Sequence, residues 1–213
     1  FQSNFLSVCT WLRKGEIECS KIEYGKFDKE SFKKRLEDIR LLSKRKNPKD
    51  FIPQMVKICA DCGVGLAIVP TPKGCTASGA TRFINGRPII LLSFRYLSDD
   101  HFWFTFFHEA GHIILHHKKE IFIEELGNDI LDDKEEKEAN NFSANILIPE
   151  HAQSLLNKIN LSKNGIVKFA VDNGISPGIV IGQLQFSGRI GFNQLNGYKR
   201  KYNWADISDL AKN

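Results

Sequence analysis

The residues with the clearest potential for chemistry are two histidines and a glutamate in the run 104-FTFFHEAGHIILH-116. His108 and His112 are four residues apart, so on a helix they stand one turn apart and both imidazoles can reach one metal ion. Glu109 lies beside the pair, where its carboxylate can take a proton from a metal-bound water without serving as a ligand. This H-E-x-x-H spacing indicates a zinc-dependent peptidase.

The residues around the motif predict a buried helix. Its apolar side chains are Phe102, Trp103, Phe104, Phe106, Phe107, Ile113, Ile114 and Leu115. A helix that is apolar on nearly every side is buried, and residues 98–100 supply polar groups that can cap its start. Burial would hold the ligands rigidly and lower the local dielectric constant, which makes a metal site tighter and its chemistry more effective.

A third ligand is expected from a second helix, predicted over residues 132–147. Acidic residues suit its N-terminal end, and Pro149 ends it. Its inward stripe contains Ala139, Phe142 and Ile146. Glu136 continues that stripe one turn earlier, whereas Glu138 lies off its centre. We therefore favour Glu136 as the third metal ligand and keep Glu138 as the alternative.

The two motifs together resemble the ImmA/IrrE family of zinc metallo-endopeptidases, of the glutamate-zincin type. The resemblance rests on F-H-E-A-G-H-I-I-L-H at residues 107–116 and on E-x-E-A-N-x-F-x-A-x-x-L-I-P at residues 136–149. It implies Zn²⁺ as the cofactor, Glu136 as the third ligand, and Asn140 as the side chain that orients a ligating imidazole. The resemblance is strong over residues 63–149 and weaker beyond them.

The resemblance also implies two functional hypotheses. The first is hydrolysis of a peptide bond in a cytoplasmic protein, such as a helix-turn-helix repressor cleaved in stress response or mobile-element control. The second is a transcription regulator or antitoxin whose peptidase-like domain is sensory or structural and is fused to a DNA-binding domain. The presence of Glu109 favours hydrolysis, because a purely structural site has no use for a base.

The chain as a whole predicts an α+β fold. Residues 1–4 resemble the remnant of a cleavable tag, and residues 5–62 form an N-terminal helical region. Residues 63–149 form a zincin-like catalytic core with a small twisted antiparallel sheet. Residues 150–213 form a C-terminal helical region that packs on the core. A length of 213 residues suits one domain with a helical addition.

Strands are expected just before the motif helix. Asn85-Gly86 separates apolar runs at residues 80–84 and 88–94, which predicts a β-hairpin. In zincin-like enzymes an edge strand pairs with the extended backbone of the substrate. We expect residues 79–84 or residues 89–94 to form that edge strand.

Charge and hydropathy narrow the class of partner. The net charge of +5 is mild, and acidic residues interrupt the basic stretch at residues 26–49, which favours a solvated helix face over a nucleic-acid surface. The sequence contains no apolar run of membrane-spanning length and does not open on a signal sequence. We expect a cytoplasmic protein that meets a protein substrate, does not meet a membrane, and contacts DNA only through a domain outside this chain.

Two further motifs have simpler structural interpretations. Cys59 and Cys62 form a C-x-x-C, but they follow the apolar spacing of a helix, which favours buried thiols over redox or metal chemistry. Residues 162–186 have the spacing of a helix-turn-helix, with Gln183 and Gln185 as the only side chains of its second helix that could contact bases. A helical corner packed on the catalytic core is therefore favoured over a DNA-binding unit.

Several polar residues near the motif could assist it. His116 lies about 6 Å along the helix axis from His112, which suits a capping role or the support of a ligand. Arg95, Tyr96 and His151 are candidates to stabilise an oxyanion, and the sequence does not choose among them.

Overall fold

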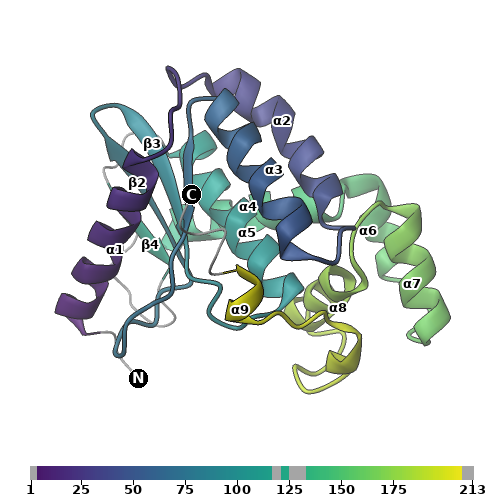
Figure 1. The fold of residues 1–213 in the computed structure, drawn as a ribbon. Coiled ribbons are helices and arrows are strands. Elements are labelled where there is room, and N and C mark those ends of the chain that lie inside the picture. Colours follow the sequence, from purple (N-terminus) through teal and green to yellow (C-terminus); the bar gives the residue numbers. More distant parts are fainter. Residues whose placement is uncertain (1–3, 117–120, 125–132, 208–213) are drawn as a thin grey trace.

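The computed structural model describes residues 4–116, 121–124 and 133–207, and it confirms the α+β class (Figure 1). Three helices come first, a four-stranded sheet and the motif helix follow, and the described chain ends in shorter helices. In chain order the elements are α1 (Phe5–Ser20), α2 (Lys29–Leu42), α3 (Pro48–Asp61), β1 (Gly65–Ile68), β2 (Gly79–Ile84), β3 (Arg87–Leu92), α4 (Asp99–Leu115), β4 (Ile121–Glu124), α5 (Asp133–Leu147), α6 (Glu150–Leu156), α7 (Lys163–Asp172), α8 (Pro177–Phe186), the 3₁₀-helix η1 (Asn196–Tyr198) and α9 (Trp204–Ile207).

The chain start contributes to the fold from Asn4 onward. Residues 1–3 of the expected tag remnant lie outside the described residues. The side chain of Asn4 accepts hydrogen bonds from the backbone amides of Leu6 and Ser7 and so caps α1. Its own backbone amide donates to the carbonyl oxygen of Gly74 at 2.7 Å, which ties the start of α1 to the loop after β1.

The sheet has the strand order β1-β3-β2-β4. The predicted hairpin is confirmed: β2 and β3 pair antiparallel, and Asn85 and Gly86 both have positive φ in the turn between them. β4 also pairs antiparallel with β2, whereas β1 runs parallel to β3. The sheet is therefore mixed, and the expectation of a purely antiparallel sheet is wrong for β1. A crossing connection over residues 69–78, and not a hairpin, follows β1.

The edge of the sheet is not where the sequence placed it. β3 lies between β1 and β2, and β2 lies between β3 and β4, so both candidate edge strands are interior. The expectation of a free edge at residues 79–84 or 89–94 is wrong. Among the described strands the edges are β1 and β4, and β4 follows the motif helix in the chain. It is only four residues long, too short to give a clear alternating pattern.

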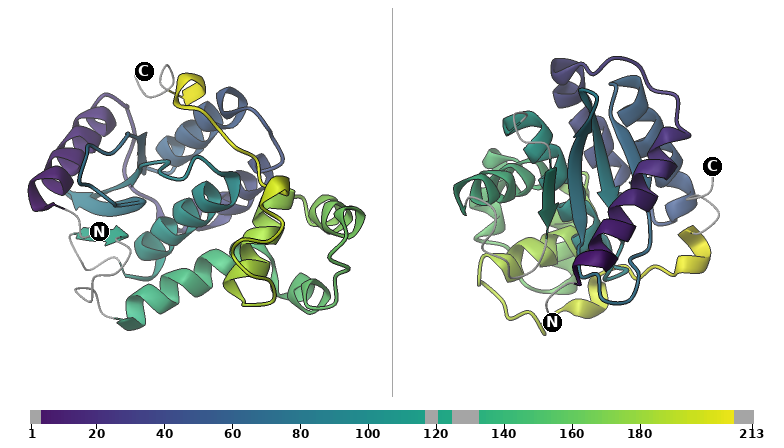
Figure 2. Two further views of the ribbon diagram at one scale, coloured as in Figure 1. Left: turned by 90° about the horizontal axis from the view of Figure 1, so that it is seen from below. Right: turned by 90° about the vertical axis from the view of Figure 1, so that its left-hand side faces the viewer.

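Helices cover both faces of the sheet (Figure 2). Ile89 and Leu91 of β3 belong to the apolar cluster under α1, and Ile90 and Leu92 belong to the main core with α3 and α4. Successive side chains of a strand point to opposite faces, so a strand with a run of consecutive apolar residues needs cover on both faces. Trp11 of α1 closes one side, where its indole N–H donates to the carbonyl oxygen of Val69 at 2.8 Å.

The motif helix α4 is the buried centre of the other side, as predicted. Its aromatic side chains Phe102, Trp103, Phe106 and Phe107 are all buried in the main core. It packs on β2 and β3 on one side and on α5 and α8 on others. Among the helices in the part of the chain that the structure describes, none combines the length and the apolar character that a membrane span needs.

Helix α8 of the C-terminal part packs on α4. α8 is buried on most of its surface, and the amide of Gln185 is turned inward, where it donates to the carbonyl oxygens of Phe192 and Gln194. α8 therefore does not present the exposed face that a DNA-recognition helix needs. Beyond α8 the chain crosses the start of α4, where Asp99 and Arg200 exchange two hydrogen bonds.

Candidate metal centre

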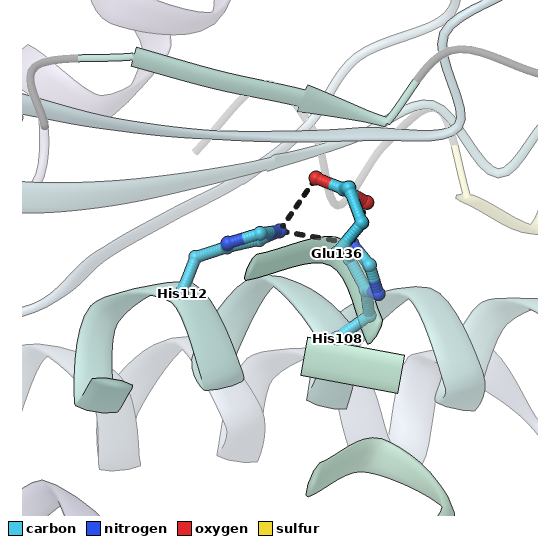
Figure 3. Close-up of side chains that lie close together, drawn as sticks. All are labelled: His108, His112 and Glu136. Atoms are coloured by element: carbon cyan, nitrogen blue, oxygen red, sulfur yellow. Dashed lines mark hydrogen bonds and ion pairs between the residues drawn. The ribbon is translucent and has the colours of Figure 1, made fainter. Parts of the chain in front are cut away.

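The two motif histidines face the same point in space (Figure 3). One turn of α4 separates them, and each is 1% exposed. Their Nε2 atoms lie 3.0 Å apart, and their ring centroids are 4.7 Å apart. Since the aromatic residues of α4 fix the helix in the core, the imidazoles are held in this geometry by packing.

Helix α5 brings the carboxylate of Glu136 to the same point (Figure 3). One of its oxygens is 3.3 Å from Nε2 of His108, and the other is 3.3 Å from Nε2 of His112. The approach of α5 to α4 is close, because Ala139 lies against Gly111, where an added Cβ would be 3.3 Å from the Ala139 Cα. Glu136 is one turn before Ala139, so the helix face that packs on α4 also carries the carboxylate.

These three side chains have the geometry and the charge states of a metal-binding set. One ligand atom from each lies within 4.8 Å of the others. Burial lowers the pKa of His112; Glu136 opposes this shift and His108 adds to it, so the imidazole is kept neutral. Burial alone would raise the pKa of Glu136, but its contacts with the two histidines outweigh that effect and lower it to about 2. Neutral imidazole and ionised carboxylate are the forms that bind a metal ion.

Within the described part of the chain, one buried oxygen of the set is left without a hydrogen-bond donor. The buried Oε1 of Glu136 accepts no hydrogen bond from the residues that the structure describes. The side-chain oxygen of Asn140 lies 3.0 Å from Nδ1 of His108, so this nitrogen carries the hydrogen and Nε2 presents its lone pair. The Nε2 atoms of the two histidines and the carboxylate oxygens of Glu136 thus lie about a hydrogen-bond length apart, and a divalent cation fits between them.

Glu138, the alternative third ligand, lies elsewhere. Its carboxylate is 2.9 Å from Nε2 of His116, and Nδ1 of His116 is 3.2 Å from Nδ1 of His112. The structure therefore brings Glu136, and not Glu138, to the histidine pair. His116 contacts His112 from the side away from the proposed metal position, in line with the expectation that it caps the helix or supports a ligand.

Glu109 is fully buried on the sheet side of α4. The hydroxyl oxygen of Thr81, in the middle of β2, is 2.7 Å from its carboxylate and 3.0 Å from its backbone oxygen. At Gly79 an added Cβ would lie 2.5 Å from Oε1 of Glu109, so only glycine leaves room for the carboxylate. Sequence reasoning missed both residues. Gly79 is 30 positions and Thr81 is 28 positions before Glu109 in the chain, and only the packing of β2 on α4 reveals the contact.

The candidates for an oxyanion-stabilising group lie on the segments just before α4 and just after α5. Arg95 and Tyr96 stack on each other, and Tyr96 also packs on His101, whose Cα is two turns, about 10 Å, before that of His108. His151 is exposed at the start of α6, beyond the C-terminal end of α5. That end of α5 is about 16 Å from Glu136 along the helix axis.

A comparison with known protein families identifies the segment that holds these residues. The family model Peptidase_M78, described as the IrrE N-terminal-like domain, matches residues 63–180, which is more than half of the chain. The matched segment runs from just before β1 into α8, so it includes the whole sheet and both helices of the metal centre. A comparison with curated proteins gives no match.

Proposed function

The chain belongs to the Peptidase_M78 family of IrrE N-terminal-like domains, a family of metallopeptidase type, and from this premise we propose that it is a zinc-dependent endopeptidase. The observation that carries the proposal is the convergence of His108, His112 and Glu136 beside a buried glutamate on the same helix. Two imidazoles and one carboxylate are the protein ligands of many catalytic zinc sites, which leave a fourth position for water or substrate.

The residues divide the work of peptide hydrolysis between them. Zinc held by the three ligands would supply a lowered pKa for water and polarisation of the substrate carbonyl. Glu109 would take the proton of the attacking water and pass it to the leaving amine nitrogen. Thr81 and Gly79 fix the carboxylate of Glu109 between β2 and α4, so the base does not have to be ordered during the reaction.

We further propose that the substrate is a cytoplasmic protein, with a helix-turn-helix repressor as the first candidate. The support for this choice is the family resemblance. The alternative role as a regulator with a sensory or structural metal site gives no reason for a buried carboxylate that two residues of β2 hold in place. A structural site needs only ligands, and Glu109 is not among the three side chains that converge.

The test separates metal binding from catalysis. Wild-type protein loaded with zinc is incubated with a helix-turn-helix repressor or with an unfolded protein such as casein, and cleavage is followed by mass spectrometry. Glu109→Gln should lower the cleavage rate at least about 100-fold, the usual contribution of a general base, and should keep one zinc per chain by metal analysis. Glu136→Ala should lose both zinc and cleavage.

An exposed glutamate provides the matched control. Glu150→Gln, at the start of α6, makes the same chemical change away from the metal centre and should cleave at the wild-type rate. Cleavage by Glu109→Gln at the wild-type rate would refute the role of Glu109. A wild-type protein that takes up no zinc would refute the metal site itself.

A further inference from the structure

We propose that His116 and Glu138 are positioning residues that hold His112 in the form that binds a metal ion. The inference rests on the proposed metal centre and concerns residues that the ligand set does not include. The two side chains come from the C-terminal end of α4 and the N-terminal half of α5, so they also connect the two helices that carry the ligands.

The contacts form a chain that starts at the ligand. Nδ1 of His112 is 3.2 Å from Nδ1 of His116, and Nε2 of His116 is 2.9 Å from the carboxylate of Glu138. The side chain of His116 is 7% exposed and that of Glu138 is 44% exposed, so the chain leads from the buried site to the surface. His116 is the C-cap of α4, and its backbone amide donates to the carbonyl oxygen of His112. This hydrogen bond fixes the backbone position from which the His116 side chain extends.

The positions of the hydrogens follow from what each atom can do. An ionised carboxylate only accepts, so Nε2 of His116 donates to Glu138. The contact between the two Nδ1 atoms holds one hydrogen, and in the metal-binding arrangement His112 donates it to the lone pair of His116. The lone pair of His112 is therefore at Nε2, which faces Nε2 of His108 and the carboxylate of Glu136. The opposite direction would put a hydrogen on Nε2 of His112 and block coordination.

The other ligating histidine has an equivalent partner. The side-chain oxygen of Asn140 accepts from Nδ1 of His108. Helix α5 thus carries the third ligand and the two residues that determine the tautomers of both histidines, one directly and one through His116. A ligand without such a partner must select one tautomer and one ring orientation when the metal binds, which weakens the affinity.

Zinc affinity of the full chain, measured by competition with a chelating dye, tests the proposal. Because loss of such a partner commonly weakens metal binding by 10- to 100-fold, His116→Ala and Glu138→Ala should each weaken zinc binding by about 10-fold or more. The double variant should bind no more weakly than His116→Ala alone, because Glu138 acts through His116. Glu138→Gln retains an acceptor oxygen and should stay close to wild type.

Two variants control for other effects of these substitutions. Lys134→Ala removes the cation 3.8 Å from Glu138 and leaves the contact with His116, so it should bind zinc as the wild type does. His116→Asn places an acceptor oxygen near the position of Nδ1 and should recover part of the affinity that His116→Ala loses. A role of His116 in packing alone would not give this recovery.

Two spectroscopic measurements separate positioning from coordination. In the metal-free protein, ¹⁵N NMR should find His112 with its hydrogen on Nδ1, and His116→Ala should give a mixture of tautomers. With Co²⁺ in place of zinc, the visible absorption bands of His116→Ala should keep the position and intensity of the wild-type bands, because the set of ligands is unchanged. A clear change in these bands would show that His116 is itself a ligand and would overturn its role as a positioning residue.

The affinities distinguish failure of this inference from failure of the proposed function. If wild type binds zinc and both His116→Ala and Glu138→Ala bind it equally well, the positioning role is refuted and the metal centre stands. Additive losses in the double variant would refute the coupling through His116. A wild-type protein that binds no zinc refutes the metal centre and, with it, the inference.

Discussion

The hydroxyl of Thr81 provides the most specific prediction about the base. Thr81 is fully buried in β2, and its oxygen lies 2.7 Å from the carboxylate of Glu109 and 3.0 Å from the backbone oxygen of the same residue. A hydroxyl has one hydrogen, which serves the carboxylate while Glu109 is ionised. When Glu109 carries a proton it can donate to Thr81, whose hydrogen then turns to the backbone oxygen. The hydroxyl can therefore support both states of a proton-transferring group.

Thr81→Val removes the hydroxyl and keeps the shape and the strand preference of the side chain. A hydrogen bond to a charged group contributes about 1.5–3 kcal/mol, and about 1.4 kcal/mol corresponds to a factor of ten in rate. If the bond acts mainly on the position of Glu109 during the reaction, kcat should fall about 10- to 100-fold. Zinc affinity should not change, because the Thr81 hydroxyl is directed at Glu109, which is not one of the three proposed ligands.

The assay compares kcat and KM on a fluorogenic peptide derived from a cleaved site, with the zinc content of each sample measured. Thr81→Ser restores a hydroxyl and should recover most of the rate. Thr105→Val makes the same change at a buried threonine of α4 whose hydroxyl faces His101, so it should change kcat much less. If Thr81→Val keeps the wild-type kcat with a full complement of zinc, the hydroxyl has no role in positioning the base.

Three other predictions concern packing, pH and metal. Gly79→Ala should lower the free energy of unfolding by about 1–3 kcal/mol in urea denaturation. The new methyl group would lie 2.5 Å from Oε1 of Glu109, and β2 cannot move away easily because it is paired on both sides. An unchanged urea midpoint would contradict this close contact. Burial raises the pKa of Asp99 above 3.8, so the folded state holds this proton more tightly than the unfolded state, and stability should fall as pH rises through the range just above 3.8. Asp99→Asn keeps the oxygen that accepts from the backbone amide of Arg200, and it should reduce this loss of stability when urea denaturation is measured at a series of pH values. If both proteins show the same pH dependence of stability, Asp99 is not the cause of it. Zinc at 100 times its Kd should stabilise the wild type by about 2.7 kcal/mol in calorimetry, and Glu136→Ala should lose most of this gain; the same gain in the variant would place zinc elsewhere.

The sequence by itself determined the features that depend on local spacing. The four-residue separation of His108 and His112 places them one turn apart on any helix, and the aromatic residues around them require that helix to be buried. The same periodicity favours Glu136 over Glu138 without any knowledge of how α5 packs. The turn at Asn85-Gly86 was equally predictable, because its positive φ angles suit these two residues.

Only the tertiary structure decided which distant residues meet. Period-two alternation could show that Gly79 and Thr81 share one face of β2, but not that α4 would present Glu109 to that face. Periodicity left Glu138 as an alternative metal ligand, and it did not predict the contact with His116, which depends on where the C-cap of α4 meets α5. The sequence likewise did not predict β4 at the sheet edge, because a strand of four residues is too short to show a clear alternating pattern. Local periodicity can be recognised from consecutive residues. Contacts between elements depend instead on how the buried surfaces of distant segments fit together, and no single segment of the sequence determines that fit.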